Sequence, residues 1–340
     1  MKLSQRLYDN ANLLKKITVI RVWNYVLLEF SYVISILIKK PLNWAFPSFF
    51  SIEPNNTCNL FCPECPAGGG HMLRPSGFMT WETYKLTISQ LSRKAIYLTL
   101  YFQGEPFLHP RIFDMIKLAQ QKRLYVSTST NGHFLDQETC SKIIESGLDK
   151  LIISLDGVDQ IAYESYRKGG DFDKVINGIN NIVQAKKQHK SKKPFIELQF
   201  LVLGTNEHQT NDITQLAKKL NVNTLNLKTA QIYDYQKGHT LIPKGESYSR
   251  YKKVSPGEYV LKSNLPNRCH RMWNGCVITQ SGDIVPCCFD KNAKHQMGNI
   301  NKSTFANIWQ SEHYQEFRQS ILSNRTAIEI CRNCTEGLQS

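Results

Sequence analysis

The chain has 340 residues, 41% of them hydrophobic and 11% aromatic, which excludes a disordered protein and a small domain held together by disulfides. Its 42 Lys and Arg against 28 Asp and Glu give a net charge of +14. This charge suits anionic partners such as phosphorylated substrates, acidic lipid headgroups or nucleic acid, without choosing among them. The first residues lack the pattern of a secretory signal, so we expect a reducing, cytoplasmic setting in which clustered cysteines bind metals.

Residues 1–48 form a segment of distinct composition. Apolar residues recur there at helical spacing, and the basic pair Lys39 and Lys40 follows them: Trp23, Val26, Leu27, Phe30, Val33, Ile34 and Leu37. The pattern predicts an amphipathic helix, which Arg21 and Glu29 interrupt too early for a confident membrane span. Three alternatives remain open: the helix packs on the rest of the domain, lies on an anionic membrane surface, or binds a partner or a second copy.

From residue 49 onward, strand patterns alternate with helix patterns. The predicted strands cover 49–55, 95–102, 124–130, 150–156, 195–203 and 224–232. The predicted helices cover 80–91, 111–121, 137–147, 172–187 and 208–220. Thr80 is suited to begin the first of these helices and Gly147 to end the third. Such alternation predicts a parallel sheet covered by helices, either as a barrel or as an open sheet.

The alternation stops after residue 232. Residues 233–268 have the composition of an irregular connection, and the basic run at 186–194 is interpreted as a solvated helix end and loop. Residues 276–288 predict a hairpin, and residues 303–322 a single helix. We therefore expect an N-terminal helical segment, a core, a connection and a C-terminal domain, with these bounds: 1–48, 49–232, 233–268 and 269–340.

Three cysteines, Cys58, Cys62 and Cys65, lie in a C-x3-C-x2-C pattern after the first predicted strand. Thiolates grouped in this way suit a soft metal site. A structural zinc ion needs four ligands, whereas three thiolates on a cubane iron–sulfur cluster leave one iron open to bind another molecule. The pattern favours a catalytic cluster, and a zinc or metal-free thiol loop is the alternative.

Further polar motifs follow other predicted strands. Gly104–Pro106 ends the second, Asn131 the third, and Ser154 and Asp156 the fourth. Because the C-terminal ends of parallel strands share one face, we expect these residues to converge with the cysteines there. Asp156 precedes a glycine, so a turn-forming role is its alternative.

The sequence CNLFCPEC resembles the signature of the radical S-adenosylmethionine (SAM) superfamily, and the resemblance extends over about residues 49–336. It implies a partial (β/α)6 TIM-like barrel. It also implies a [4Fe-4S] cluster on Cys58, Cys62 and Cys65 whose open iron binds SAM. Reductive cleavage of SAM would then make a 5′-deoxyadenosyl radical that abstracts hydrogen from substrate. Glu64 departs from the family pattern, which often has an aromatic residue before the third cysteine.

The same resemblance implies which residues bind SAM. Gly104, Glu105 and Pro106 correspond to the segment whose backbone holds the methionine amino group, and glycine there allows close approach of the ligand. Ser154, Asp156 and Arg167 resemble residues that bind ribose or carboxylate, and Asn131 is expected at the same site. For Arg167 the alternative is an ordinary surface arginine.

Four cysteines near the C-terminus form a second set: Cys269, Cys287, Cys331 and Cys334. Gly282 lies five positions before the second of them, and the set resembles the single-cluster twitch form of the SPASM family. This implies an auxiliary [4Fe-4S] cluster with no open iron, which would transfer electrons or position substrate. Zinc is the alternative for these four ligands. Cys276 and Cys288 lie close to two of these ligands and could replace them, but we interpret both as packing residues or as residues beside the ligands, and Cys140 as a core residue.

Together these patterns predict a radical SAM oxidoreductase or maturase that uses SAM and two [4Fe-4S] clusters. Its substrate could be a small molecule, a peptide or a lipid-linked compound, and flavodoxin or ferredoxin would donate electrons. We expect a cytoplasmic protein, with peripheral contact to the inner face of a membrane through the N-terminal helix, and do not favour nucleic acid as a partner. The alternative is a non-enzymatic iron–sulfur or zinc protein.

Overall fold

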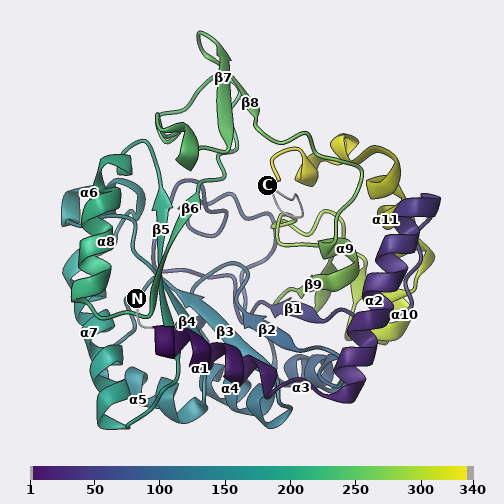
Figure 1. The fold of residues 1–340 in the computed structure, drawn as a ribbon, viewed down its shortest axis with the longest axis horizontal. Helices are drawn as coiled ribbons and strands as arrows, with labels where there is room; N and C mark the ends of the chain where they lie inside the picture. Colours follow the sequence, from purple (N-terminus) through teal and green to yellow (C-terminus); the bar gives the residue numbers. More distant parts are fainter. Residues whose placement is uncertain (1–2, 335–340) are drawn as a thin grey trace. The chain divides into compact units, whose positions relative to one another are not determined.

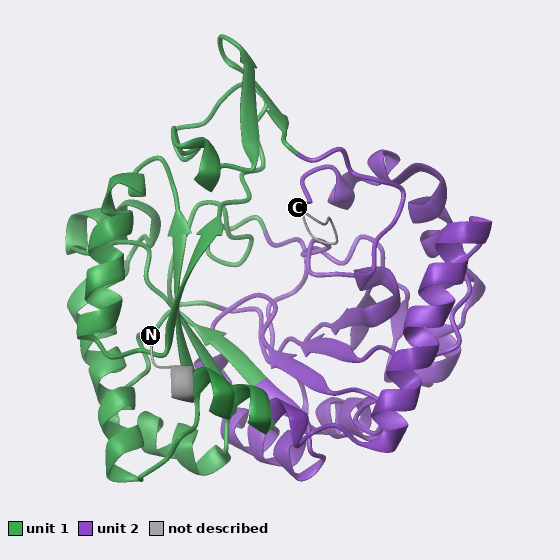
Figure 2. Ribbon diagram, viewed as in Figure 1, with its two compact units in different colours: residues 1–12, 58–71, 127–262 green, residues 13–57, 72–126, 263–340 purple. Residues whose placement is uncertain are grey.

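The computed structural model describes residues 3–334, which form two compact units. Figure 2 shows unit 1 in green and unit 2 in purple. Unit 1 combines residues 1–12, 58–71 and 127–262, and unit 2 combines residues 13–57, 72–126 and 263–340. The chain therefore enters both units more than once.

Unit 1 is built on parallel strands in the order β3 (Tyr125–Thr130), β4 (Lys150–Ser154), β5 (Phe195–Val202) and β6 (Thr224–Thr229). The strands alternate in the chain with α5 (Gln137–Ser146), α6 (Gln160–Tyr166), α7 (Phe172–Gln188) and α8 (Thr210–Lys219). Figure 1 shows α7 and α8 on the outer side of β5. Because both faces of such a sheet are covered, nearly every residue of β5 is buried. The predicted alternation of strands and helices is confirmed.

Unit 2 contains β1 (Phe49–Ile52), which pairs in parallel with both β2 (Tyr97–Leu100) and β9 (Gly275–Ile278). The strand β9 continues antiparallel into β10 (Asp283–Val285), and β10 pairs with β11 (Gly298–Asn299). The predicted hairpin thus forms around a turn at Thr279–Gly282, where Gly282 has φ +86. The sequence pattern did not predict that this hairpin joins the sheet beside β1.

Helices in both units begin or end where the sequence predicts. Thr80 accepts from the Thr83 amide at the start of α3 (Trp81–Leu91). In unit 1, Gly147 adopts φ 77 at the end of α5, a conformation that glycine reaches without a Cβ penalty. The predicted helix at 111–121 is α4 (Ile112–Gln121).

The predicted single helix at 303–322 is in fact two. After the short α9 (Arg271–Asn274), the chain forms α10 (Phe305–Trp309) and then α11 (Glu312–Asn324). Ser311 lies between them, and its hydroxyl accepts from the Tyr314 amide to begin α11. A serine that caps a new helix competes with continuation of the previous one.

The connection at 233–268 is less irregular than expected. It contains an antiparallel pair, β7 (Tyr251–Ser255) and β8 (Glu258–Leu261), which stands away from the rest of unit 1 in Figure 1. Gly257 in its turn has φ +76. The side chains of β7 beyond Tyr251 are exposed, so the pair lacks the alternating apolar pattern by which strands are recognised.

The N-terminal segment forms α1 (Leu3–Leu14) and α2 (Val19–Ile38). The expected helix is therefore present, but its polar side is the buried one. Arg21, Asn24, Ser31 and Ser35 are buried with Leu28, whereas most of the predicted apolar stripe is exposed. Among residues 3–334, α2 alone is long and apolar enough to cross a membrane, by length and composition only.

Candidate functional site

The loop that carries the first three cysteines follows β1 in the chain and belongs to unit 1. Two turns shape it: the Cys65 amide donates to the Cys62 carbonyl (3.1 Å), and the Gly69 amide donates to the Cys65 carbonyl (2.6 Å). A Cβ on Gly68 would lie 2.8 Å from the Cys62 nitrogen, closer than a side chain tolerates. The glycine run after the cysteines therefore allows the backbone to pack directly on the cysteine loop.

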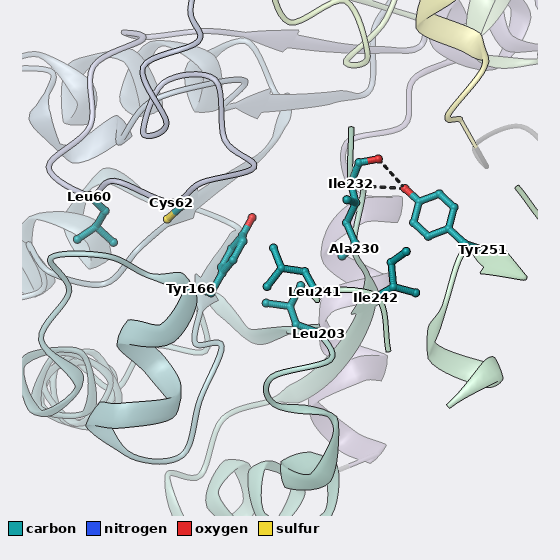
Figure 3. Close-up of a cluster of buried hydrophobic side chains, with 9 residues drawn as sticks. All are labelled: Leu60, Cys62, Tyr166, Leu203, Ala230, Ile232, Leu241, Ile242 and Tyr251. Atoms are coloured by element: carbon teal, nitrogen blue, oxygen red, sulfur yellow. Dashed lines mark hydrogen bonds between the residues drawn. The ribbon is translucent and has the colours of Figure 1, made fainter. Parts of the chain in front are cut away.

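Cys62 lies in an apolar cluster of unit 1, which Figure 3 shows with Leu60 and Tyr166. The other buried members of the cluster come from the ends of β5 and β6 and from the connection: Leu203, Ala230, Ile232, Leu241, Ile242 and Tyr251. Cys58 and Cys65 pack against this cluster and are partly exposed. The loop thus has one buried thiol and two that are partly open to solvent.

Asn131 follows the end of β3 and lies beside the cysteine loop. Its side-chain nitrogen donates to Asn59 Oδ1 (2.8 Å) and lies 3.8 Å from the Cys58 sulfur. An N–H group directed at a thiolate stabilises the negative charge. The structure therefore brings together Asn131 and the cysteines. It adds Asn59, which lies within the cysteine motif, but whose contact with the distant Asn131 cannot be seen in the sequence.

Arg167 and Asp156 form an ion pair next to the cysteine loop. Arg167 Nε donates to Asp156 Oδ2 (2.6 Å), and the other carboxylate oxygen accepts from the Leu201 amide (2.7 Å). Arg167 Nη1 lies 3.9 Å from the Cys62 sulfur. Burial works against the charge of Arg167, but the nearby Asp156 and Cys62 outweigh it and raise the pKa of Arg167 well above its ordinary value. Arg167 is therefore a cation paired with a buried carboxylate beside a thiol, and its role toward SAM stays a prediction.

Burial raises the pKa of the Cys62 thiol, and Arg167 opposes part of that rise. A thiol must lose its proton to bind iron, so cluster loading at this loop releases protons. The cation at Arg167 compensates the charge that remains on the sulfur. The three thiols are ligands that fit an iron–sulfur cluster, and the cation beside them compensates negative charge.

The remaining predicted SAM-binding residues lie at two places. Ser154 is the buried last residue of β4 in unit 1. Gly104–Pro106 belongs to unit 2, where a Cβ on Gly104 would lie 2.6 Å from the Thr57 carbonyl oxygen. Glu105 is buried, its amide donates to the same oxygen, and its carboxylate accepts from the Phe107 amide at the start of the 3-10 turn Pro106–Leu108. This segment is therefore held against the residue that precedes Cys58.

The four C-terminal cysteines gather in unit 2 around Arg325. Arg325 Nη2 donates to the Cys334 sulfur (3.6 Å), and the charges of Cys269, Cys334 and Cys331 together raise the pKa of Arg325 against the opposing effect of burial. Burial raises the pKa of Cys331 to about 11, and Arg325 opposes that rise. Burial, followed by the neighbouring Cys288, raises the pKa of Cys287 well above its ordinary value.

Arg325 is a second residue that sequence reasoning missed. It is almost fully buried although it carries a charge, and Nη1 also donates to the Arg268 carbonyl (2.8 Å), next to Cys269. Its place in a short connection after α11 gives no local signal of this role. A buried cation needs hydrogen-bond acceptors or nearby negative charge, and thiolates in a cluster provide negative charge.

Other cysteines behave as predicted for packing residues. Cys140 and Cys276 are buried in α5 and β9. Cys288 is partly buried and lies 3.5 Å from Arg271 Nη1. Among residues 3–334, no three Cys, His, Asp or Glu side chains are arranged to hold one metal ion. A cubane does not require that arrangement, because each of its thiolates binds a different iron.

Comparison with known proteins identifies the class. Residues 52–217 match the Radical SAM superfamily, and residues 269–335 match SPASM, an iron–sulfur cluster-binding domain. The tungsten-containing aldehyde ferredoxin oxidoreductase cofactor-modifying protein of Pyrococcus furiosus is 24% identical, over 84% of this chain and 87% of its own. The S-adenosyl-L-methionine-dependent 2-deoxy-scyllo-inosamine dehydrogenase of Niallia circulans is 23% identical, over 84% of this chain and 92% of its own.

Solved structures show the same architecture. BtrN in complex with AdoMet and 2-DOIA has a TM-score of 0.54 at 21% identity, covering 87% of this chain and 95% of that chain. The structure of anSMEcpe with bound AdoMet has a TM-score of 0.63 at 19% identity, covering 85% of each. The predicted partial TIM-like barrel followed by an auxiliary-cluster region is confirmed.

The chain is a radical SAM enzyme with a C-terminal SPASM domain. Its radical SAM domain binds SAM and a [4Fe-4S] cluster, and its SPASM domain binds auxiliary iron–sulfur. Homologues named as dehydrogenase, maturase and synthase make the non-enzymatic alternative the poorer fit. The bounds of the predicted domains and the roles of individual residues stay predictions.

Proposed function

We propose that Cys58, Cys62 and Cys65 hold the catalytic [4Fe-4S] cluster and that SAM binds at its open iron. When bound, the reduced cluster supplies the electron that cleaves SAM to the hydrogen-abstracting 5′-deoxyadenosyl radical. The observation that carries this proposal is a three-thiol loop with Arg167 Nη1 3.9 Å from the middle sulfur and Asn131 Nδ2 3.8 Å from the first.

We propose that the SAM-binding residues predicted from the sequence bind and orient SAM. The backbone of Gly104–Pro106 would hold the methionine amino group, with Glu105 fixing the turn. Arg167 would offer N–H groups to the SAM carboxylate, since guanidinium pairs well with carboxylate. Asp156 would act through Arg167, because both of its oxygens already accept hydrogen bonds. Ser154 and Asn131 would contact the nucleoside or the cluster loop.

For the auxiliary site we propose that Cys269, Cys287, Cys331 and Cys334 hold a second [4Fe-4S] cluster, which Arg325 stabilises. With every iron bound by the protein, this cluster is suited to accept an electron from a substrate radical, as an oxidation requires. A flavodoxin or ferredoxin would reduce the catalytic cluster.

The substrate is the least constrained part of the proposal. Among similar proteins, BtrN was solved with 2-DOIA, and SuiB with its precursor peptide SuiA. We therefore propose a small-molecule, peptide or lipid-linked substrate. For location we propose the cytoplasm, with contact to the inner face of a membrane through the N-terminal helix.

SAM cleavage tests the proposal. Anaerobic, reconstituted protein reduced with dithionite should convert SAM to methionine and 5′-deoxyadenosine, measured by chromatography. Cys62→Ala should abolish this product, and the matched Cys140→Ala, which removes a buried cysteine of α5, should not. Equal product from the cluster-loaded wild type and Cys62→Ala would overturn the assignment.

A further inference from the structure

Helix α2 packs on unit 2 with its polar side and exposes its apolar side. Arg21 and Asn24 are 3% and 5% exposed, whereas Trp23, Phe30 and Leu37 are 64%, 62% and 75% exposed. An amphipathic helix of a globular protein ordinarily has the opposite arrangement. The exposed face is therefore not a by-product of poor packing, because the polar side is specifically bound.

Hydrogen bonds fix this orientation. The guanidinium of Arg21 donates to the carbonyls of Lys16, Ser92, Lys122 and Arg123. The side chain of Asn24 donates to the Phe46 carbonyl (2.9 Å) and accepts from the Phe46 amide (3.0 Å). Ser35 Oγ likewise bonds both the carbonyl (3.1 Å) and the amide (2.8 Å) of Leu42. Rotation of the helix to bury its apolar side would break all of these bonds.

We call the exposed large apolar side chains of this segment the α2 face. It consists of exposed residues of α2 together with Trp44: Val19, Ile20, Val22, Trp23, Tyr25, Val26, Phe30, Val33, Leu37, Ile38 and Trp44. Large exposed apolar patches mark sites of interaction. Two tryptophans and a tyrosine within it are the residues enriched where proteins meet the headgroup layer of a bilayer.

The charged side chains that flank α2 in the sequence are mostly basic. Lys15 precedes the helix and Lys39 and Lys40 follow it, all exposed. The exposed Lys122 and Arg123 lie near its beginning, since their carbonyls bind Arg21. Between residues 13 and 45 the sequence has one acidic residue, Glu29, and it is paired with His270 (2.8 Å). An apolar centre with a cationic border is complementary to an anionic lipid surface.

We propose that the α2 face binds the surface of an anionic phospholipid bilayer, with α2 lying in the headgroup layer. A second copy of the chain is a poorer occupant, because a two-fold contact would bring the cationic borders of both copies together. Spanning the bilayer is also disfavoured, because Arg21, Asn24 and Ser35 would have to leave their partners and enter hydrocarbon. This proposal rests on the membrane contact proposed above and adds to it the class of lipid and the side of α2 that binds. It does not depend on the radical chemistry.

Sedimentation with vesicles tests this inference on the full-length protein loaded with its clusters. At low salt the protein should pellet with vesicles of phosphatidylcholine and phosphatidylglycerol, and much less with phosphatidylcholine alone. Lys39→Gln with Lys40→Gln should weaken binding by about fivefold per lysine. Trp23→Gln with Phe30→Gln and Leu37→Gln should weaken it by about a hundredfold or more, since three apolar side chains lose their burial.

Ile161→Gln is the matched control, because Ile161 is an exposed apolar residue (87%) on α6 of unit 1; it should leave binding unchanged. The substituted side chains are exposed, so the fold should survive, and circular dichroism checks this. Brominated lipids in the anionic vesicles should also quench tryptophan fluorescence, and Trp23→Phe should reduce the quenching.

Any of four results would overturn the inference. Full-length protein could remain in the supernatant at low salt. The triple variant could bind vesicles as well as the wild type. It could instead abolish a concentration-dependent dimer in the absence of lipid, which would identify a second copy as the occupant. Resistance of the bound protein to extraction by alkaline carbonate would indicate a spanning helix and likewise contradict surface binding. SAM cleavage in solution is a separate measurement and can succeed or fail independently.

Discussion

Arg167 carries its charge close to a cysteine, and a buried carboxylate determines where that charge lies. Asp156 is 1% exposed and accepts from Arg167 Nε through one oxygen and from the Leu201 amide through the other. These two hydrogen bonds connect the segment after β4 to strand β5 and to the end of α6. A polar group with this role affects function by positioning the guanidinium rather than by touching the ligand.

Asp156→Asn should lower the free energy of unfolding by about 3 kcal/mol, because it leaves a buried cation without its partner. Urea unfolding followed by circular dichroism measures this. The control is Asp114→Asn, whose partner Arg111 is also exposed, and which should cost less than about 1 kcal/mol. Equal losses for both variants would contradict the account.

Enzyme kinetics test separately whether Asp156 positions Arg167 to bind the carboxylate of SAM. Arg167→Lys keeps the charge but lacks the two-pronged geometry that pairs with a carboxylate. In cluster-loaded protein it should raise the KM for SAM more than it lowers kcat, and Asp156→Asn should act in the same direction. A fall in kcat alone, with KM unchanged, would speak against carboxylate binding by Arg167.

Gly104 is required by its surroundings as well as by its backbone angle. It has φ +75, and a Cβ there would lie 2.6 Å from the Thr57 carbonyl oxygen. Gly257 has nearly the same angle, φ +76, with nothing within 4 Å. Gly104→Ala should therefore destabilise the protein by about 2–3 kcal/mol and Gly257→Ala by about 1 kcal/mol, measured by the same unfolding assay. A Gly104→Ala variant as stable as Gly257→Ala would show that the contact with Thr57 is not tight.

Sequence reasoning identified residues whose role depends on neighbours in the chain. The cysteines of both sets and the motifs at strand ends could be chosen because spacing and strand position are local properties. Asn59 and Arg325 could not, since Asn131 and Cys334, the residues that they contact, are brought to them only by folding.

At the level of elements, α2 illustrates the limit of a hydrophobic pattern. The pattern correctly predicted a helix and its apolar stripe. It could not predict which side packs, because that depends on carbonyls of Ser92 and Phe46 that the polar side binds. For the same reason, Arg21 is not one of the basic residues that could meet lipid headgroups: its guanidinium is enclosed by backbone oxygens.

Asn24→Ala should lower the free energy of unfolding more than substitution of a polar helix residue usually does. It would leave the amide and carbonyl of Phe46 without partners in a buried place, at a cost of about 2–3 kcal/mol. Val33→Ala, on the exposed side of the same helix, should change stability by about 0.5 kcal/mol or less. If thermal or urea unfolding instead finds Val33→Ala the more damaging change, then α2 packs by its apolar side.

Other features of the helices and strands also differ in whether the nearby sequence determines them. Thr80 caps the start of α3 and Gly147 caps the end of α5, so the sequence near each boundary is enough to predict it. The parallel pairing of β9 with β1 joins residues more than two hundred positions apart, and no local pattern encodes it. The exposed pair β7 and β8 was missed because few of its side chains alternate between core and solvent.

For the whole molecule, we expect two separate iron–sulfur clusters in one chain. Reconstituted protein should contain about eight irons, and the Cys58→Ala, Cys62→Ala and Cys65→Ala triple variant about half as many. Metal analysis and the visible absorption of the purified proteins measure this. Zinc without a brown chromophore in the triple variant would identify the C-terminal cysteines as a zinc site.

The central claim is that the N-terminal cluster has an open iron to which SAM binds. Its most direct test is electron paramagnetic resonance of the reduced Cys331→Ala, Cys334→Ala variant, which should hold only the cluster on Cys58, Cys62 and Cys65. Addition of SAM should shift the g-values of that cluster, because a new ligand joins one of its irons. An unchanged spectrum, in protein that contains about four irons, would contradict the claim.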